Sequence, residues 1–183
     1  MGIYDLTWIE DRFLPYITPT GHGINHELVD LERKRDMAIV RDLLKMKGNQ
    51  VWSVSLETIV KDALKLMAKK DIGAVLIIED TKIVGIFSER DFARHMVSVD
   101  VLSDAMLVKD LMSQPVFFVN PDQAIEECMA VMTSKHFRHL PVLENGQLIG
   151  LVSIGDVVKQ LISEKETTIK GLEDYILGHD YSH

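Results

Sequence analysis

The chain has 183 residues, of which 46% are hydrophobic and 26% are charged, and its formal net charge is −8. These proportions are typical of a globular protein, and the negative charge argues against nucleic-acid binding, which needs concentrated Lys and Arg. A single cysteine excludes an intramolecular disulfide, and no apolar stretch approaches the roughly 18 residues of a membrane span. With neither a signal peptide nor a transit peptide in view, we expect a cytoplasmic protein without membrane contact.

An internal repeat organises the chain. Residues 51–94 align with residues 116–159 without a gap, at a constant offset of 65 and with 8 identities in 44 positions. A related pair, "VRDLL" at 40–44 and "VKDLM" at 108–112, precedes the two copies at an offset of 68. The sequence therefore predicts four parts, with these limits: an N-terminal extension at 1–37, repeat 1 at 38–98, repeat 2 at 106–163 and a C-terminal helical tail at 164–183.

The first half of each repeat is predicted to be a strand followed by a helix. The β-branched and aromatic runs "QVWSV" and "PVFFV" favour strands. We expect the helix to begin at Ser55 in the first copy. In the second copy, Asn120 is the expected N-cap, with Pro121 at the first helical position and Gln123 completing a capping box. An apolar stripe at helical spacing follows, comprising Val60, Ala63, Leu64 and Met67, matched by Ile125, Cys128, Met129 and Met132.

The second half of each repeat is predicted to be a hairpin followed by a second helix. In the second copy, Asn145-Gly146 lies between "HLPVL" and "QLIGLVS", and Asn-Gly between apolar runs is a strong hairpin signal. A helix is expected from Ser88 in the first copy and from Ser153 in the second. Each repeat is thus predicted to be β-α-β-β-α, and the protein to be of the mixed α/β (α+β) class.

Both copies keep a serine and an aspartate, as Ser88 with Asp91 and as Ser153 with Asp156. At a strand-to-helix junction, free backbone N–H groups and the helix N-terminus form a place for an anion. The aspartate one turn further on can accept hydrogen bonds from the vicinal hydroxyls of a ribose. The alternative is structural, because serine is a common N-cap and aspartate is favourable in a first turn. Spacing alone leaves both interpretations open.

These motifs resemble the cystathionine-β-synthase (CBS) domain in its tandem arrangement, the Bateman module. The residues that carry the resemblance are "VRDLL", "VSLETIVKDALKLM", "IGAVLII" and "KIVGIFSERD", and in the second copy "VKDLM", "VNPDQAIEECMAVM" and "RHLPVLENGQLIGLVSIGD". The resemblance covers residues 40–163. It implies two repeats related by a pseudo-twofold axis, with two clefts between them that bind adenosine-type ligands such as AMP, ADP, ATP, NAD or S-adenosylmethionine.

Carried over position by position, the resemblance implies two unequal clefts. Ser88, Arg90 and Asp91 would face Arg138 and His139, which offers a phosphate a guanidinium from each repeat. The second cleft holds Ser153 and Asp156 opposite Gly73 and Ala74, and we expect it to lack cations and to be the weaker site. Base contacts are expected from apolar residues of the adjoining strands, namely Val54, Ile86, Val119 and Pro141.

The remaining reactive residues are not expected to form a catalytic or metal site. Cys128 lies on the apolar helix stripe, which favours core packing over a nucleophile. His136 and His139 have no second pair of ligands, which argues against a metal. The expectation is a non-catalytic regulatory protein that binds an adenine nucleotide, AMP before the others, and signals to a partner. The alternative is a scaffold with empty clefts. We also expect a homodimer, to which the tail contributes; the alternative for the tail is that it caps the module of its own chain.

Overall fold

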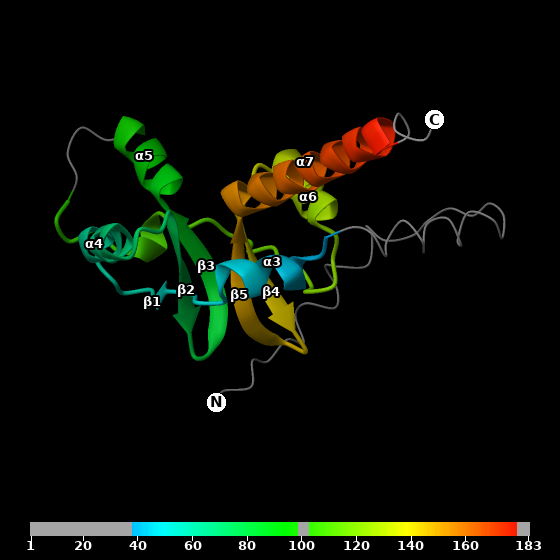
Figure 1. The fold of residues 1–183 in the computed structure, drawn as a ribbon. Helices are drawn as coiled ribbons and strands as arrows, with labels where there is room; N and C mark the ends of the chain where they lie inside the picture. Colours follow the sequence, from blue (N-terminus) through cyan, green and yellow to red (C-terminus); the bar gives the residue numbers. More distant parts are fainter. Residues whose placement is uncertain (1–37, 99–102, 179–183) are drawn as a thin grey trace.

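The computed structural model describes residues 38–98 and 103–178, so the predicted N-terminal extension lies outside the described residues. Figure 1 shows the fold. The elements of the first half, in chain order, are α3 (Val40–Lys47), β1 (Ser53–Val54), α4 (Val60–Lys70), β2 (Ala74–Glu79), β3 (Lys82–Ser88) and α5 (Glu89–Ser98). Those of the second half are the 3₁₀ turn η1 (Val108–Asp110), α6 (Ile125–Lys135), β4 (His139–Glu144), β5 (Gln147–Ser153) and α7 (Ile154–Gly178).

Two hairpins lie side by side at the centre of the molecule (Figure 1). In the first repeat, β1 pairs in parallel with β2, and β2 pairs antiparallel with β3. In the second, β4 and β5 form a two-stranded antiparallel sheet. The predicted strand at 115–119 is reduced to a parallel bridge between Val119 and Val142. The mixed α+β class and the two repeats are confirmed, and the first strand of each repeat is shorter than predicted.

The backbone conformation recurs at the same offset as the sequence repeat. Left-handed φ angles occur at Asp71, Asp80 and Thr81, and again 65 positions later at His136, Asn145 and Gly146. Asp71 and His136 end α4 and α6, whereas the other four form the two-residue turns of the hairpins. Two consecutive left-handed residues make the turn that matches strand twist, which is why Asn-Gly predicted the second hairpin correctly. The same turn in the first hairpin uses Asp-Thr, which is a much weaker sequence signal.

Each repeat is covered by the lead-in segment of the other. Val40, Leu43 and Leu44 of α3 are buried in the core of repeat 2, among residues of α6, β4 and β5. Correspondingly, Val108 is fully buried in the core of repeat 1, with Met112 packed against the same cluster. The two halves therefore cannot bury their apolar faces independently. A third cluster, of Leu76, Ile83, Phe118 and Leu143, joins the two halves.

This exchange explains why the predicted helix starts are wrong. Helix α4 begins at Val60 and α6 at Ile125, five residues after Ser55 and Asn120. The Val60 N–H donates to the Met106 carbonyl at 2.8 Å, and the Ile125 N–H donates to the Ala38 carbonyl at 3.0 Å. Main-chain acceptors from the opposite lead-in thus satisfy donors that a side-chain cap would otherwise satisfy. The residues between form turns, with Thr58 N–H donating to the Ser55 carbonyl and Gln123 N–H donating to the Asn120 carbonyl.

Two glycines permit the close approach of the lead-in segments. A Cβ atom at Gly150 would overlap the Leu44 side chain, and one at Gly85 would overlap Met112. Gly85 and Gly150 are equivalent positions of the two repeats, as are Leu44 and Met112 of the two lead-ins. The kept glycine therefore marks the point where a strand touches the partner repeat's lead-in.

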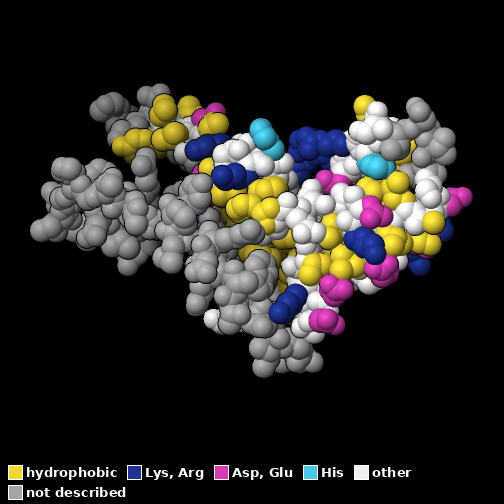
Figure 2. Space-filling model, turned by 180° about the vertical axis from the view of Figure 1, so that it is seen from behind, with side chains coloured by type: hydrophobic (Ala, Val, Ile, Leu, Met, Phe, Trp, Pro, Cys, Tyr) yellow, Lys and Arg dark blue, Asp and Glu magenta, His cyan; other side chains and the backbone are white. Residues whose placement is uncertain are grey.

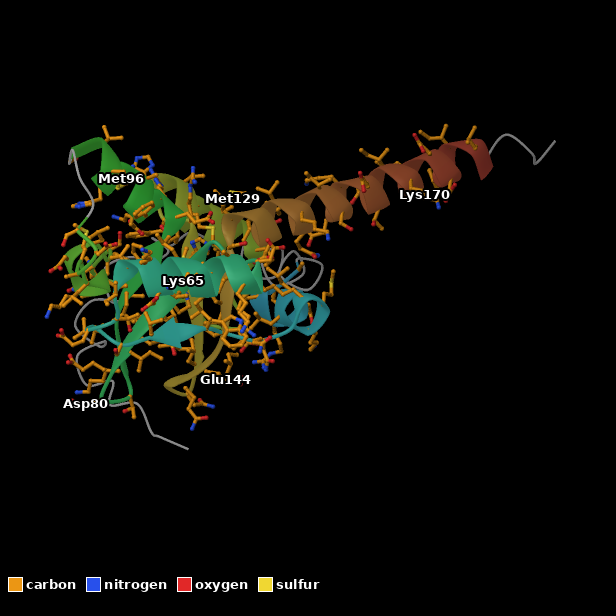
Figure 3. The ribbon with its side chains drawn as sticks, turned by 90° about the vertical axis from the view of Figure 1, so that its left-hand side faces the viewer. Lys65, Asp80, Met96, Met129, Glu144 and Lys170 are labelled. Carbon is orange, nitrogen blue, oxygen red and sulfur yellow. The ribbon has the colours of Figure 1, made fainter. Side chains whose placement is uncertain are left out.

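Helix α7 is the longest element, and it passes without a break from repeat 2 into the predicted tail (Figure 1). Its 25 residues span about 37 Å at 1.5 Å per residue. Figure 3 shows Lys170 on the part of α7 that extends beyond the other described elements, whereas Asp80 and Glu144 lie at the opposite end, at the tips of the hairpins. In residues 38–98 and 103–178, no helix combines the length and the apolar character that crossing a bilayer requires.

Candidate functional site

The two Ser-x-x-Asp motifs form the same hydrogen-bonded arrangement at the starts of α5 and α7. Asp91 accepts from the Ser88 backbone N–H at 2.9 Å and from its hydroxyl at 2.5 Å, while the Asp91 N–H donates to Ser88 Oγ at 3.3 Å. Asp156 and Ser153 repeat these contacts at 2.8, 2.7 and 3.2 Å. The capping role is therefore confirmed for both serines, and a ligand role for the aspartates must coexist with it.

A pocket of about 240 Å³ lies between the two repeats, at the second motif. Its repeat 2 side consists of His139, Leu151, Ser153 and Asp156. Its other wall comes from two connections of the first half, comprising Lys47 with residues 50–52, and residues 71–74. The pocket thus forms only where the halves meet. Gly73 and Ala74 face Ser153 and Asp156 here, as the sequence analysis expected.

Lys47 ends α3 and brings a cation into this pocket. Its ammonium group donates a hydrogen bond to Oδ2 of Asp156, and the two side chains are 30% and 25% exposed. Gly48, with a φ of 88°, ends the helix at this point and turns the chain toward β1. The expectation that this cleft lacks cations is therefore wrong. Burial alone would raise the pKa of Asp156, but the hydrogen bonds from Lys47 and Ser153 outweigh burial and lower it.

His139 stands at the first position of β4, paired across the hairpin with Ser153, and it lines this pocket. The sequence analysis expected it opposite Ser88 in the other cleft, but the pairing of β4 with β5 brings it to the second motif. Its ring lies against Gly73, since a Cβ at that glycine would be 3.8 Å from Nε2. Burial lowers the pKa of His139 to about 4, with Lys47 and Arg138 acting in the same direction and Asp156 and Asp91 opposing it. The imidazole is therefore neutral at pH 7. It adds a hydrogen-bonding group to the pocket but no charge.

The first motif, predicted to form the stronger cleft, is more fully engaged in internal contacts. Ser113 donates to Oδ1 of Asp91 at 2.8 Å, so hydrogen bonds from Ser88 and Ser113 reach both carboxylate oxygens. The Arg90 guanidinium donates to the His136 carbonyl at 2.9 Å, which ties it to repeat 2. Arg138 is exposed at the entry to β4. The structure thus brings Arg90 close to the other repeat, as predicted, but holds it on a backbone oxygen.

The residues predicted to contact the base are less accessible than expected. Val119 is 3% exposed and lies in the core of repeat 2, where its N–H donates to the Pro141 carbonyl at 3.0 Å. Pro141 is also buried, whereas Val54 and Ile86 are partly buried among core residues. In the pocket, Val51 and Trp52 are the apolar residues of the first strand segment.

Lys47, Val51, Trp52 and Asp71 are pocket residues that the sequence analysis did not single out. Repeat 1 has three more residues than repeat 2 between its lead-in and its first strand, within "KMKGNQ". This insertion was the available signal for Lys47, because it gives the first copy a lysine beside the cleft. Which carboxylate that lysine meets follows from the exchanged lead-ins, and these depend on tertiary packing.

Cys128 lies where the sequence analysis expected, in the core. Cys128 is fully buried in the core of repeat 2, and burial raises the pKa of its thiol to about 12, which suits packing and not a nucleophile. Among the residues that the structure describes, no group of three or more His, Cys, Asp or Glu is placed to hold a metal ion.

The family of the chain follows from its two repeats. A model of the CBS domain matches residues 40–98 and 108–163, which together make up more than half of the sequence. The protein therefore belongs to the CBS-domain family, and it carries two such domains in tandem.

Relatives and solved structures agree with this assignment. The chain is 32% identical over 149 residues to the mitochondrial CBS domain-containing protein CBSX3 of Arabidopsis thaliana, an alignment that covers 76% of this chain and 72% of that protein. A protein with CBS domains from Burkholderia ambifaria MC40-6 is 46% identical, with a TM-score of 0.66 over 69% of this chain and 95% of that one. The CBS-domain protein ATU1752 of Agrobacterium tumefaciens is 36% identical, with a TM-score of 0.64 over 67% and 92%.

Proposed function

We propose that this protein is a regulatory CBS pair that binds an adenine nucleotide, AMP before ADP, ATP, NAD or S-adenosylmethionine, in the pocket at Asp156. The observation that carries the proposal is the pocket itself, in which a carboxylate suited to ribose hydroxyls and a cation suited to phosphate come from opposite repeats. A solved CBS pair of the same fold, 19% identical, contains 5′-methylthioadenosine and S-adenosylmethionine. The cleft at Ser88, Arg90 and Asp91 is proposed as a second, weaker position.

The first prediction is that an adenine nucleotide stabilises the fold. A ligand at a hundred times its dissociation constant adds about 2.7 kcal/mol to the free energy of unfolding. For a chain of this size, that corresponds to a rise of about 5–10 °C in the melting temperature. Thermal melts with AMP, ADP, ATP, NAD and S-adenosylmethionine at millimolar concentration measure it. No rise with any of the five would favour the alternative, a scaffold with empty clefts.

A signalling role without catalysis fits the arrangement of the site. Ligand contacts from both repeats would change how tightly the halves are held, and α7 begins within the pocket and extends beyond the module. The solved Burkholderia relative is described as a signal-transduction protein. We propose that a regulated protein partner recognises the ligand state and that the protein acts in the cytoplasm. The Arabidopsis relative is mitochondrial by its name.

We further propose that the protein is a homodimer and that the projecting part of α7 contributes to the contact. Apolar side chains follow one face of this helix, with Ile162, Ile169, Leu172 and Ile176 each more than half exposed. Figure 2 shows hydrophobic side chains gathered on the projecting end of this helix. A stripe of this kind, on a helix that the described residues of its own chain leave uncovered, is typical of a subunit contact.

The second prediction tests this contact. The double substitution Ile169→Glu and Leu172→Glu places two charges in the apolar stripe and is expected to lower the apparent mass measured by light scattering. Thr167→Glu, on the opposite face of the same helix, is the control and should leave the mass of the wild type unchanged. If the double variant keeps the wild-type mass, the tail does not hold the subunits together.

A further inference from the structure

We infer that Lys47 selects the ligand of this pocket by exchanging partners: it neutralises Asp156 in the free protein and moves to the 5′-phosphate of a bound nucleotide. The pocket would then prefer a nucleoside 5′-monophosphate to the bare nucleoside. The inference rests on the proposed function, because it requires an adenine nucleotide in this pocket.

The first step of the argument concerns the occupied carboxylate. Oδ2 of Asp156 already accepts from the Ser153 N–H, from the Ser153 hydroxyl and from Lys47. A ribose whose two hydroxyls donate one to each carboxylate oxygen needs a place at Oδ2 as well as at Oδ1. The Ser153 contacts cap α7 and belong to the fold, so the Lys47 contact is the one that a ligand can replace.

The second step concerns charge. The pocket is lined by one cation, Lys47, and by two carboxylates, Asp71 and Asp156, while the buried His139 is neutral at pH 7. A phosphate that entered with Lys47 still held by Asp156 would meet a site without a free cation. A nucleoside that displaced Lys47 would leave the ammonium without a partner. A nucleotide avoids both costs, because its hydroxyls take Asp156 and its phosphate takes Lys47.

The third step is that Lys47 can move. Its side chain is 30% exposed, it stands at the last residue of α3, and Gly48 follows it. A lysine is a flexible point charge with three donors, so its ammonium group can follow an anion without a fixed geometry. The partner exchange therefore needs a rotamer change and no movement of α3, whose apolar residues are held in the core of repeat 2.

The motif at Asp91 gives an internal comparison. There the opposite lead-in supplies Ser113, whose hydroxyl donates to Asp91. Ser113 thus contacts Asp91 much as Lys47 contacts Asp156, but without a charge. A hydroxyl displaced by a ribose loses one hydrogen bond to the carboxylate and, because it carries no charge, cannot form an ion pair with a phosphate. Selection for phosphate through this exchange is thereby confined to the Asp156 pocket.

The test is calorimetry of the full chain with AMP and with adenosine as the two probes. For the wild type we expect AMP to bind at least about 10-fold more tightly than adenosine. Lys47→Met removes the charge but keeps the length of the side chain, so it should weaken the binding of AMP about 10-fold. Adenosine should bind as tightly as before or more tightly, because Asp156 is then free. The AMP preference is expected to disappear.

Two controls separate selection from folding. Lys45→Met removes a lysine from the same helix, where it pairs with Asp42 outside the pocket, and should keep the wild-type preference. Lys47→Arg keeps the charge and should keep most of the preference, even if Lys47→Met proves unstable. An unchanged preference in Lys47→Met, or equal affinities in the wild type, overturns the inference and leaves the proposed function standing. A wild type that binds neither probe overturns the inference, and the proposed function falls with it unless the thermal melts show a rise with ADP, ATP, NAD or S-adenosylmethionine.

Discussion

Asp156→Ala is expected to weaken adenosine binding by about 10- to 100-fold. The substitution removes the acceptor of the ribose hydroxyls, and hydrogen bonds to a charged group contribute roughly 1.5–3 kcal/mol. The affinity for AMP should fall less than the affinity for adenosine, because Lys47 is released from Asp156 and remains available to the phosphate. Calorimetry with both ligands measures the difference.

The matched control is Asp62→Ala. Asp62 is an exposed acid on α4 that pairs with Lys65 away from the pocket, so its removal should leave both affinities unchanged. Asp91→Ala in the same assay compares the two motifs. We expect it to weaken the binding of AMP less than Asp156→Ala does. If Asp91→Ala abolishes AMP binding while Asp156→Ala leaves it intact, the Ser88 cleft is the stronger site, as the sequence alone suggested. If neither substitution matters, both motifs are helix caps without a ligand.

We propose Asp156 over Asp91 as the acceptor of the ribose hydroxyls for physical reasons that involve several segments at once. The sequence predicted the first cleft to be the stronger site because Arg90 and Arg138 could bind a phosphate. In the structure, Arg90 donates to the His136 carbonyl, and Asp91 accepts hydrogen bonds through both carboxylate oxygens. Asp156 has Lys47, a residue 109 positions away in the chain. A motif identifies which residue types are present, whereas the contacts that occupy them depend on packing.

The parts of the fold that were predictable are those set by local pattern. Neighbouring residues in the sequence predict the alternation of strand and helix, the Asn145-Gly146 turn and the helix starts after Ser88 and Ser153. Because the two copies align, the hairpin predicted in the second copy could also be predicted in the first. The helix starts at Val60 and Ile125 were mispredicted because their first donors are satisfied by the opposite lead-in. No local pattern reports such an exchange.

The pocket itself shows the same division. Ser153, Asp156, Gly73 and Ala74 could be named from the repeat and its resemblance to a family, whereas His139 was expected in the other cleft. The positions of Lys47 and Trp52 depend on where a lead-in helix packed on the other repeat comes to an end. The charge of this pocket therefore depends on tertiary packing. The presence of Lys47 changes the ligand expected here from a nucleoside to a nucleotide.

The last prediction concerns pH, and it rests on His139. Its pKa is lowered from 6.5 to about 4 in the folded protein, chiefly by burial, whereas the unfolded chain keeps the ordinary value. Between these values the unfolded state binds a proton that the folded state does not, so stability is full above about pH 6.5 and falls as the pH drops toward 4. For a partly exposed group, we expect a loss on the order of 2 kcal/mol between pH 7.5 and pH 4.5.

Urea unfolding at these two pH values, on the wild type and on His139→Gln, measures the effect. The variant should lose less stability than the wild type, because it has no imidazole to protonate, while the acids and bases that surround His139 remain and cancel in the comparison. Those neighbours are Asp156, Lys47, Asp91 and Arg138. The lowered pKa of Asp156 acts below this range, since its carboxyl protonates under 3.8. The control is His136→Asn, which removes an exposed histidine at the end of α6. Asparagine tolerates the left-handed backbone conformation of this position, so the variant should fold and keep the wild-type pH dependence. Equal pH dependence in the wild type and in His139→Gln would mean that the imidazole takes up its proton without cost, and that the pocket is more open to water than its packing against Gly73 implies.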